Sequence, residues 1–126
     1  MTLRVARHTK EPERIKTFYL ELLGLDLLGE FQGHDGYDGI FIGSKGLDWH
    51  LEFTVSDHLP SHTADEDDLL VFYAAKPEYD RILERMSDAG IPSVTPRNPY
   101  WEKKGKTFVD PDGFRVVIVP NKPSNS

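Results

Sequence analysis

Hydrophobic and polar residues alternate over residues 48–55, which predicts a half-buried β-strand. Leu51 and Phe53 would lie on one face of this strand, and His50 and Glu52 on the other. A glutamate between apolar neighbours needs a face that is open to water or to a polar cavity. The pattern therefore indicates a site on the polar face of this strand.

The first half of the chain predicts a strand, a helix and three strands, in that order. Apolar residues recur at helical spacing after Pro12, and the helical face consists of Ile15, Phe18, Tyr19, Leu22 and Leu23. Thr9 is the expected N-cap and Gly24 the expected stop. The strands are expected at 2–6, 26–31, 37–42 and 48–55, with turns at 32–36 and 43–46.

The second half repeats this order. A strand at 69–74 precedes a helix that Pro77 opens and Gly90 stops. Strands are expected at 91–95, 106–109 and 114–119, and a strong turn sequence, Asp110-Pro111-Asp112-Gly113, joins the last two.

The two halves match in pattern and little in residue identity. We therefore predict an α+β fold in which residues 1–126 form one domain of two β-α-β-β-β modules, at about 2–55 and 69–119. An acidic linker without periodicity, 56–68, would join them. Mixed sheets curved around a central cavity would place His50 and Glu52 inside it.

Composition narrows the class of protein. The 126 residues include 15 Lys and Arg and 21 Asp and Glu, a net charge of −6, which argues against binding to nucleic acid or to an anionic membrane. The absence of cysteine excludes disulfides and thiolate chemistry. No apolar run is long enough for a bilayer and no signal peptide is recognisable, so we expect a cytoplasmic location.

Several motifs together resemble the vicinal-oxygen-chelate superfamily, which includes lactoylglutathione lyase, bleomycin-resistance proteins and extradiol dioxygenases. They are the helix end Phe18-Tyr19…Leu23-Gly24-Leu25, the strand Leu51-Glu52-Phe53-Thr54 and the hairpin Asp110-Pro111-Asp112-Gly113-Phe114. The stretches 34–39 and 98–101 resemble an uncharacterised bacterial subgroup of glyoxalase-like proteins. The resemblance implies a small-molecule site within the sheets and a homodimer.

The resemblance also implies four metal-ligand positions, which fall near Arg4, on Glu52, on Leu69 (or on Asp68 if the register slips) and on Val117. In the unslipped register only Glu52 can ligate a metal, because a guanidinium has no lone pair to offer and the other two side chains are apolar. A divalent metal on nitrogen and oxygen ligands needs about three protein groups. We therefore expect no metal and no other cofactor, with a divalent metal as the less favoured alternative.

Glu52 and His50 are the candidate catalytic residues. Glu52 would act as a base or would form a structural ion pair with Arg4. His50 would act as an acid or base or would be a rim histidine bonded to a neighbour. The candidates for ligand binding are Arg4, His34, Tyr37, Tyr73, Asn98, Tyr100 and Trp101. Of these, Tyr100 and Trp101 lie in a stretch expected to be irregular, where aromatic side chains would wall a pocket or cap the core.

Two function classes remain open at this stage. One is a metal-independent protein that binds a small organic molecule between aromatic walls. The other is a lyase or dioxygenase-type enzyme of the same superfamily that uses Glu52 and His50, with or without a metal.

Overall fold

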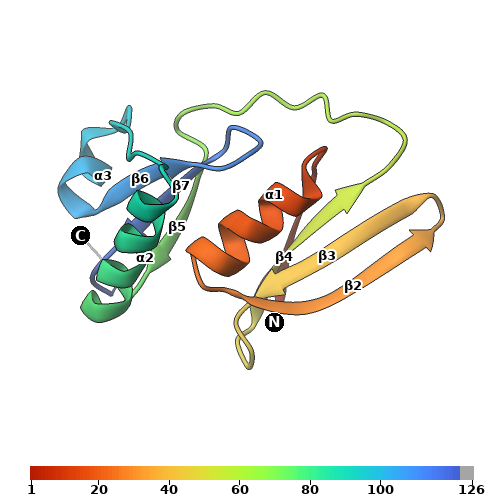
Figure 1. Ribbon diagram of the computed structural model, residues 1–126, viewed down its shortest axis with the longest axis horizontal. Helices are drawn as coiled ribbons and strands as arrows, with labels where there is room; N and C mark the ends of the chain where they lie inside the picture. The colour runs from red at the N-terminus through yellow and green to blue at the C-terminus, as the bar shows by residue number, and fades with distance from the viewer. Residues whose placement is uncertain (123–126) are drawn as a thin grey trace. The chain divides into compact units, whose positions relative to one another are not determined.

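Each half of the chain forms a small mixed sheet with its own helices (Figure 1). The computed structural model describes residues 1–122 and divides into two units, one of residues 1–62 and one that begins at residue 63. Each sheet contains one parallel and at least one antiparallel strand pair. The predicted α+β class with two small mixed sheets is therefore confirmed.

The first unit contains a four-stranded sheet of order β1-β4-β3-β2. Its elements are β1 (Leu3–His8), α1 (Pro12–Lys16), the π-helical turn η1 (Thr17–Leu22), β2 (Asp26–His34), β3 (Tyr37–Gly43) and β4 (Trp49–Val55). β1 runs parallel to β4, and the other pairs are antiparallel. The five elements of the predicted first module are all present.

The helix of this unit packs on the apolar face of β4. Tyr19 is fully buried, and its ring centroid lies 5.0 Å from that of Phe53. The N-cap is Glu11 and not Thr9 as predicted. The buried Thr9 hydroxyl instead accepts a hydrogen bond from the Glu11 backbone N–H at 3.0 Å, so it orders the turn before the helix.

The β2–β3 hairpin is longer than the sequence predicted. His34 pairs with Tyr37, and only Asp35 and Gly36 form the turn, with φ angles of 52° and 85°. Two consecutive positive φ angles match the twist of a hairpin, and Asp-Gly is a favoured pair for them. A register shift between Phe31 and His34 takes up the extra residues that had been expected in the turn.

The second unit contains a three-stranded sheet of order β5-β7-β6. Its elements are β5 (Leu69–Tyr73), α2 (Lys76–Asp88), α3 (Pro99–Lys104), β6 (Lys106–Val109) and β7 (Arg115–Val119). β5 runs parallel to β7, and β6 runs antiparallel to it. Residues 116–119 alternate between the two sheet faces and are all buried, so both faces of β7 are covered.

Two sequence predictions for this unit are wrong. The strand expected at 91–95 is reduced to an isolated bridge from Val94 to Thr107, because Pro92 and Pro96 cannot donate ladder hydrogen bonds. The stretch expected to be irregular contains α3. Asn98 caps this helix and Pro99 occupies its first turn, which are favourable residues at those positions.

Part of the predicted linker is tied to the second unit. Arg97 pairs with Asp65, Glu66 and Asp67 at 3.4, 3.0 and 3.3 Å, and Arg115 pairs with Glu66 at 2.8 Å. The pKa of Asp65 is lowered, first by the backbone hydrogen bond from Asp67 and then by the positive charge of Arg97.

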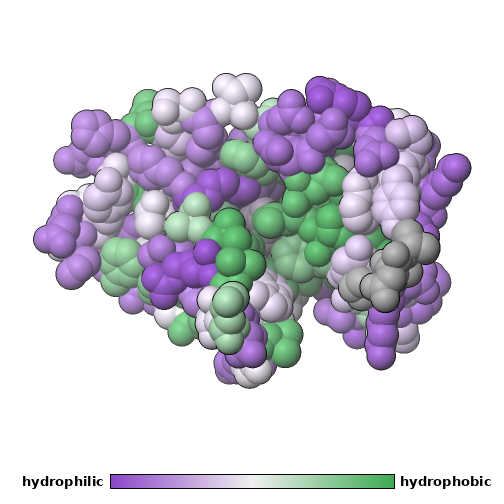
Figure 2. All heavy atoms as spheres, turned by 180° about the vertical axis from the view of Figure 1, so that it is seen from behind, coloured by the Kyte–Doolittle hydropathy of each residue, from purple (hydrophilic) through white to green (hydrophobic). Residues whose placement is uncertain are grey.

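Large apolar side chains also reach the surface. Figure 2 shows hydrophobic side chains between hydrophilic ones on one face of the molecule. Leu3 and Val5 of β1 are 60% and 42% exposed. No helix within residues 1–122 is both long and apolar enough to cross a membrane.

Candidate functional site

The helix-free face of the first sheet carries a cluster of polar and aromatic side chains. Leu51 and Phe53 are buried on the face that the helix covers, so His50 and Glu52 lie on the opposite face. In the strand register, Arg4 stands beside His50 and Phe41 beside Glu52. These four residues therefore share one face, and we call them the sheet-face cluster.

Arg4 connects the members of the sheet-face cluster. Its Nε donates to His50 Nε2 at 2.8 Å, and its Nη1 lies 4.0 Å from Glu52 Oε1. Its guanidinium carbon lies 4.8 Å from the centre of the Phe41 ring, a cation–π distance. The side chain of Arg4 is 53% exposed and that of Glu52 14%. Solvent therefore reaches the Arg4 side chain and weakens its electrostatic attraction to Glu52.

The hydrogen bond from Arg4 determines the proton position on His50. Arg4 can only donate, so His50 Nε2 must offer its lone pair. The imidazole in this contact is therefore neutral, with its proton on Nδ1. In this arrangement His50 Nε2 can neither donate a proton nor accept one from a ligand, because its lone pair is engaged with Arg4. The role of Glu52 as a general base stays a prediction.

An aromatic series extends along the same face from the sheet-face cluster. The Phe41 ring lies 5.7 Å from the Phe31 ring, which lies 6.2 Å from the His34 ring. A Cβ at Gly39 would lie 2.2 Å from the Phe31 ring, so glycine allows this ring to rest on β3. His34, the last residue of β2, is exposed and lies 3.6 Å from Asp35, and Tyr37 is 45% exposed near His8.

The second unit contains a hollow of about 230 Å³ with aromatic walls. Its lining consists of Tyr73, Tyr100, Trp101, Lys104, Val119, Asn121 and Lys122, and we call it the aromatic hollow. The rings of Tyr100 and Trp101 meet edge to face at 4.9 Å, and Lys104 Nζ lies 5.3 Å from the Tyr100 ring centre. Three of the predicted ligand-binding residues are thus brought together.

Asn98 is the N-cap residue of α3, and its predicted part in ligand binding stays a prediction. Its Oδ1 accepts the Tyr100 backbone N–H at 3.1 Å, and it does not line the aromatic hollow. Its role is to start α3 and so to position Tyr100 and Trp101. Whether Tyr37, His50 and Glu52 share a pocket with Tyr100 and Trp101 stays a prediction, because the two groups belong to different units.

The residues at the implied metal positions do not fit a divalent metal. Val117 is fully buried and Leu69 is half-buried, and neither offers a donor. At the first position, the Arg4 guanidinium would place a positive charge beside Glu52. Within residues 1–122, no three His, Asp or Glu side chains gather in a way that could hold a metal ion. The expectation of a metal-free protein stays a prediction.

Sequence reasoning missed six residues of these two regions, which are Phe31, Phe41, Lys104, Val119, Asn121 and Lys122. Strand alternation would have placed Phe31 and Phe41 on the same face as His50 and Glu52 if the strand pairing had been known. Lys104 and Lys122 left no recognisable signal, because only the fold of α3 and of the segment after β7 brings them into one lining with Tyr73.

The fold is that of the glyoxalase and bleomycin-resistance proteins. The chain is similar in structure to glyoxalase I of Leishmania major, with a TM-score of 0.74 and 19% identity over 94% of this chain and 85% of that one. It is also similar to TnmS3, an antibiotic-binding protein from Streptomyces sp. CB03234, with a TM-score of 0.66 and 26% identity over 98% and 96% of the two chains.

Within this class the chain belongs to the YycE-like family. The models of the YycE-like N-terminal and C-terminal domains match residues 3–54 and 67–120. The uncharacterised protein YycE of Bacillus subtilis (strain 168) is 39% identical over 95% of this chain and 88% of its own. The crystal structure of a YycE protein of unknown function from Bacillus subtilis has a TM-score of 0.89 and 38% identity, covering 99% of this chain and 93% of that one.

Proposed function

We propose that the chain binds a small organic molecule against the aromatic hollow, without the metal centre of the superfamily's enzymes. The observation that carries this proposal is the convergence of Tyr73, Tyr100 and Trp101 on one concave surface. Small-molecule sites are concave and aromatic, with a few polar groups that fix orientation. The likeness to an antibiotic-binding protein supports the same function.

The lining of the aromatic hollow favours a planar anion. Among residues 1–122, this lining includes Lys104 and Lys122 and no acidic residue. Flat aromatic walls gain most from a flat apolar ligand, and an ammonium group at the rim attracts a carboxylate. Aromatic carboxylates are therefore the first compounds to test.

Tryptophan fluorescence tests this proposal directly, because the chain has two tryptophans. Trp49→Phe leaves Trp101 as the reporter, and its emission is expected to change on titration with 2-naphthoate or salicylate. The neutral analogue 2-naphthol should bind more weakly. Lys104→Gln should lower the affinity for the two carboxylates and leave the affinity for 2-naphthol unchanged.

Calorimetry on Trp101→Ala provides the second measurement. Removing a central aromatic contact is expected to weaken binding by about tenfold or more. Thermal unfolding shows whether the variant is folded, and chelator-treated protein should bind as well as untreated protein. Unchanged affinity in a folded Trp101→Ala variant would contradict the proposal, and so would a requirement for a divalent metal.

The second candidate function is a lyase or dioxygenase-type reaction at the sheet-face cluster. The observation that favours it is the contact of one guanidinium with both His50 and Glu52. Such an arrangement offers a carboxylate base and a cation that could hold an anionic substrate. Turnover by wild type that is lost in a folded Glu52→Gln variant would establish this function.

A further inference from the structure

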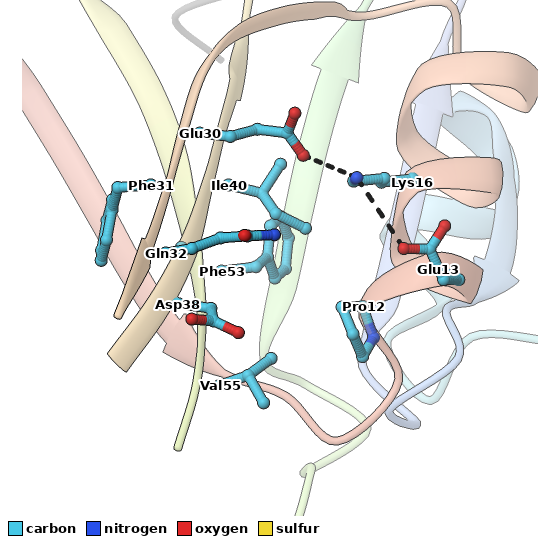
Figure 3. A pocket seen from close by; sticks show the side chains of 11 residues that line it. Pro12, Glu13, Lys16, Glu30, Phe31, Gln32, Asp38, Ile40, Phe53 and Val55 are labelled. Atoms are coloured by element: carbon cyan, nitrogen blue, oxygen red, sulfur yellow. Dashed lines mark ion pairs between the residues drawn. The ribbon is translucent and has the colours of Figure 1, made fainter. Parts of the chain in front are cut away.

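A second hollow, of about 440 Å³, lies within the first unit (Figure 3). It lies between the start of the helix and the free end of the β2–β3 hairpin, it is open to solvent, and we call it the hairpin hollow. Its lining consists of Pro12, Glu13, Lys16, Glu30, Phe31, Gln32, Asp38, Gly39, Ile40, Phe53 and Val55. Because Ile40 and Phe53 face the helix, the hairpin hollow lies on the opposite side of the sheet from the sheet-face cluster.

The floor of the hairpin hollow is apolar. Ile40 and Phe53 are 5% and 2% exposed, and they are paired neighbours on β3 and β4. Val55 and Pro12 continue the apolar surface toward the opening, while the Phe31 ring points away (Figure 3). This floor can accept the hydrocarbon part of a ligand.

The rim of the hairpin hollow is polar and carries a net negative charge. Lys16 on the helix lies 2.6 Å from Glu30 on β2 and 3.8 Å from Glu13. The pKa of Lys16 is raised, chiefly by its hydrogen bond to Glu30, so this amine stays charged and shared between two carboxylates. Asp38 adds a third carboxylate. Arg7 adds a second cation, because its guanidinium carbon lies 5.1 Å from the centre of the Phe53 ring, so three carboxylates and two cations give a net charge of −1 around the hollow.

Gln32 and Asp38 complete the rim from the hairpin side. Both side chains point into the gap beside Pro12 (Figure 3). Asp38 Oδ1 accepts the backbone N–H of Gly33 at 2.9 Å, which holds the carboxylate in place. The Gln32 amide supplies a further carbonyl acceptor. The rim therefore presents hydrogen-bond acceptors above an apolar floor.

From this combination we infer that the hairpin hollow binds an organic ammonium ion with an apolar body. The ammonium group would replace its water shell with the oxygens of Asp38, Gln32 and Glu13. Its hydrocarbon part would lie on Val55 and Pro12, the half-buried residues of the floor, beside the buried Ile40 and Phe53. The net negative rim disfavours a carboxylate of the same shape.

Benzylammonium at neutral pH is a suitable probe, with benzoate and benzyl alcohol as matched controls of charge. Amide chemical shifts recorded during titration should change around residues 13–16, 30–40 and 53–55 for benzylammonium and should not change for benzoate. Shifts confined to other residues, or equal shifts with benzoate, would overturn the inference.

Two variants test the rim and the floor separately. Asp38→Asn keeps the acceptor for Gly33 and removes the charge, so affinity for benzylammonium should fall by about tenfold. Asp57→Asn makes the same change of net charge in an exposed loop and should leave affinity unchanged. Val55→Thr is nearly isosteric and makes the floor more polar. It should lower the affinity for benzylammonium more than the affinity for methylammonium, which has no large apolar body. Equal affinity of wild type and Asp38→Asn would overturn the inference.

Discussion

At the scale of single residues, Arg4 decides how the sheet-face cluster can act. It donates to His50 and approaches Glu52, so the two candidate catalytic residues share one cation. The sequence left open whether Glu52 forms an ion pair or serves a ligand. The ion pair is present, but its Nη1–Oε1 distance of 4.0 Å is long and the Arg4 side chain is half exposed. Such a pair is weak, so the Arg4 and Glu52 side chains can each turn toward a bound molecule.

The substitution Glu52→Gln is expected to change stability little. A partly exposed ion pair contributes about 0–1 kcal/mol, and Arg4 keeps its hydrogen bond to His50 in the variant. Denaturant unfolding of wild type and Glu52→Gln measures the difference, with Glu84→Gln on the surface of α2 as the control. A loss of several kcal/mol would show that Glu52 is a structural residue and not part of a site.

At the scale of secondary-structure elements, Gly105 connects α3 to β6 and so holds the aromatic hollow in place. A Cβ at Gly105 would lie 1.9 Å from the Ile118 carbonyl oxygen and 3.1 Å from the Val119 Cα atom. These are backbone atoms of β7, which cannot rotate away as a side chain can. The close approach therefore requires glycine at this position.

We expect Gly105→Ala to destabilise the second unit by about 1–3 kcal/mol, because α3 must move away from β7. The same variant should weaken ligand binding at the aromatic hollow, since α3 carries Tyr100 and Trp101. Thermal unfolding and fluorescence titration measure the two effects.

Gly29→Ala is the matched control, because the nearest atom to its Cβ is Phe41 Cδ2 at an ordinary 3.5 Å. Equal stability of Gly105→Ala and Gly29→Ala would contradict the role assigned to Gly105.

At the scale of the whole molecule, each sheet ends in an edge strand that has a pairing partner on one side only. β1 pairs only with β4 in its sheet, and β5 only with β7, among the strands of residues 1–122. Exposed edges are usually covered or paired with another chain. Leu3 and Val5 add exposed apolar surface to β1.

We therefore predict a homodimer in solution, as the superfamily resemblance also implies. Sedimentation velocity at micromolar concentration should show twice the mass of the chain. Val5→Lys should shift the protein toward monomer, whereas Leu59→Lys, in an exposed loop, should not. A wild-type monomer under these conditions would contradict the prediction.

The sequence by itself determined the elements whose signals are local. Alternation over 48–55 placed His50 and Glu52 opposite Leu51 and Phe53, because side chains of a strand point to alternate faces. Gly24 and Gly90 ended both helical stretches, and both have positive φ angles, 79° and 73°. These features depend only on neighbouring residues, so a pattern in the sequence is enough to find them.

Only the tertiary structure decided which distant residues meet. Val94 retains a single bridge because two prolines limit its pairing, and α3 brings Tyr100 and Trp101 beside Tyr73 of a different element. The hairpin hollow joins Lys16 to Glu30 across a helix and a strand. Such contacts depend on strand register and on helix packing, which residues far apart in the chain determine together. No local pattern contains that information.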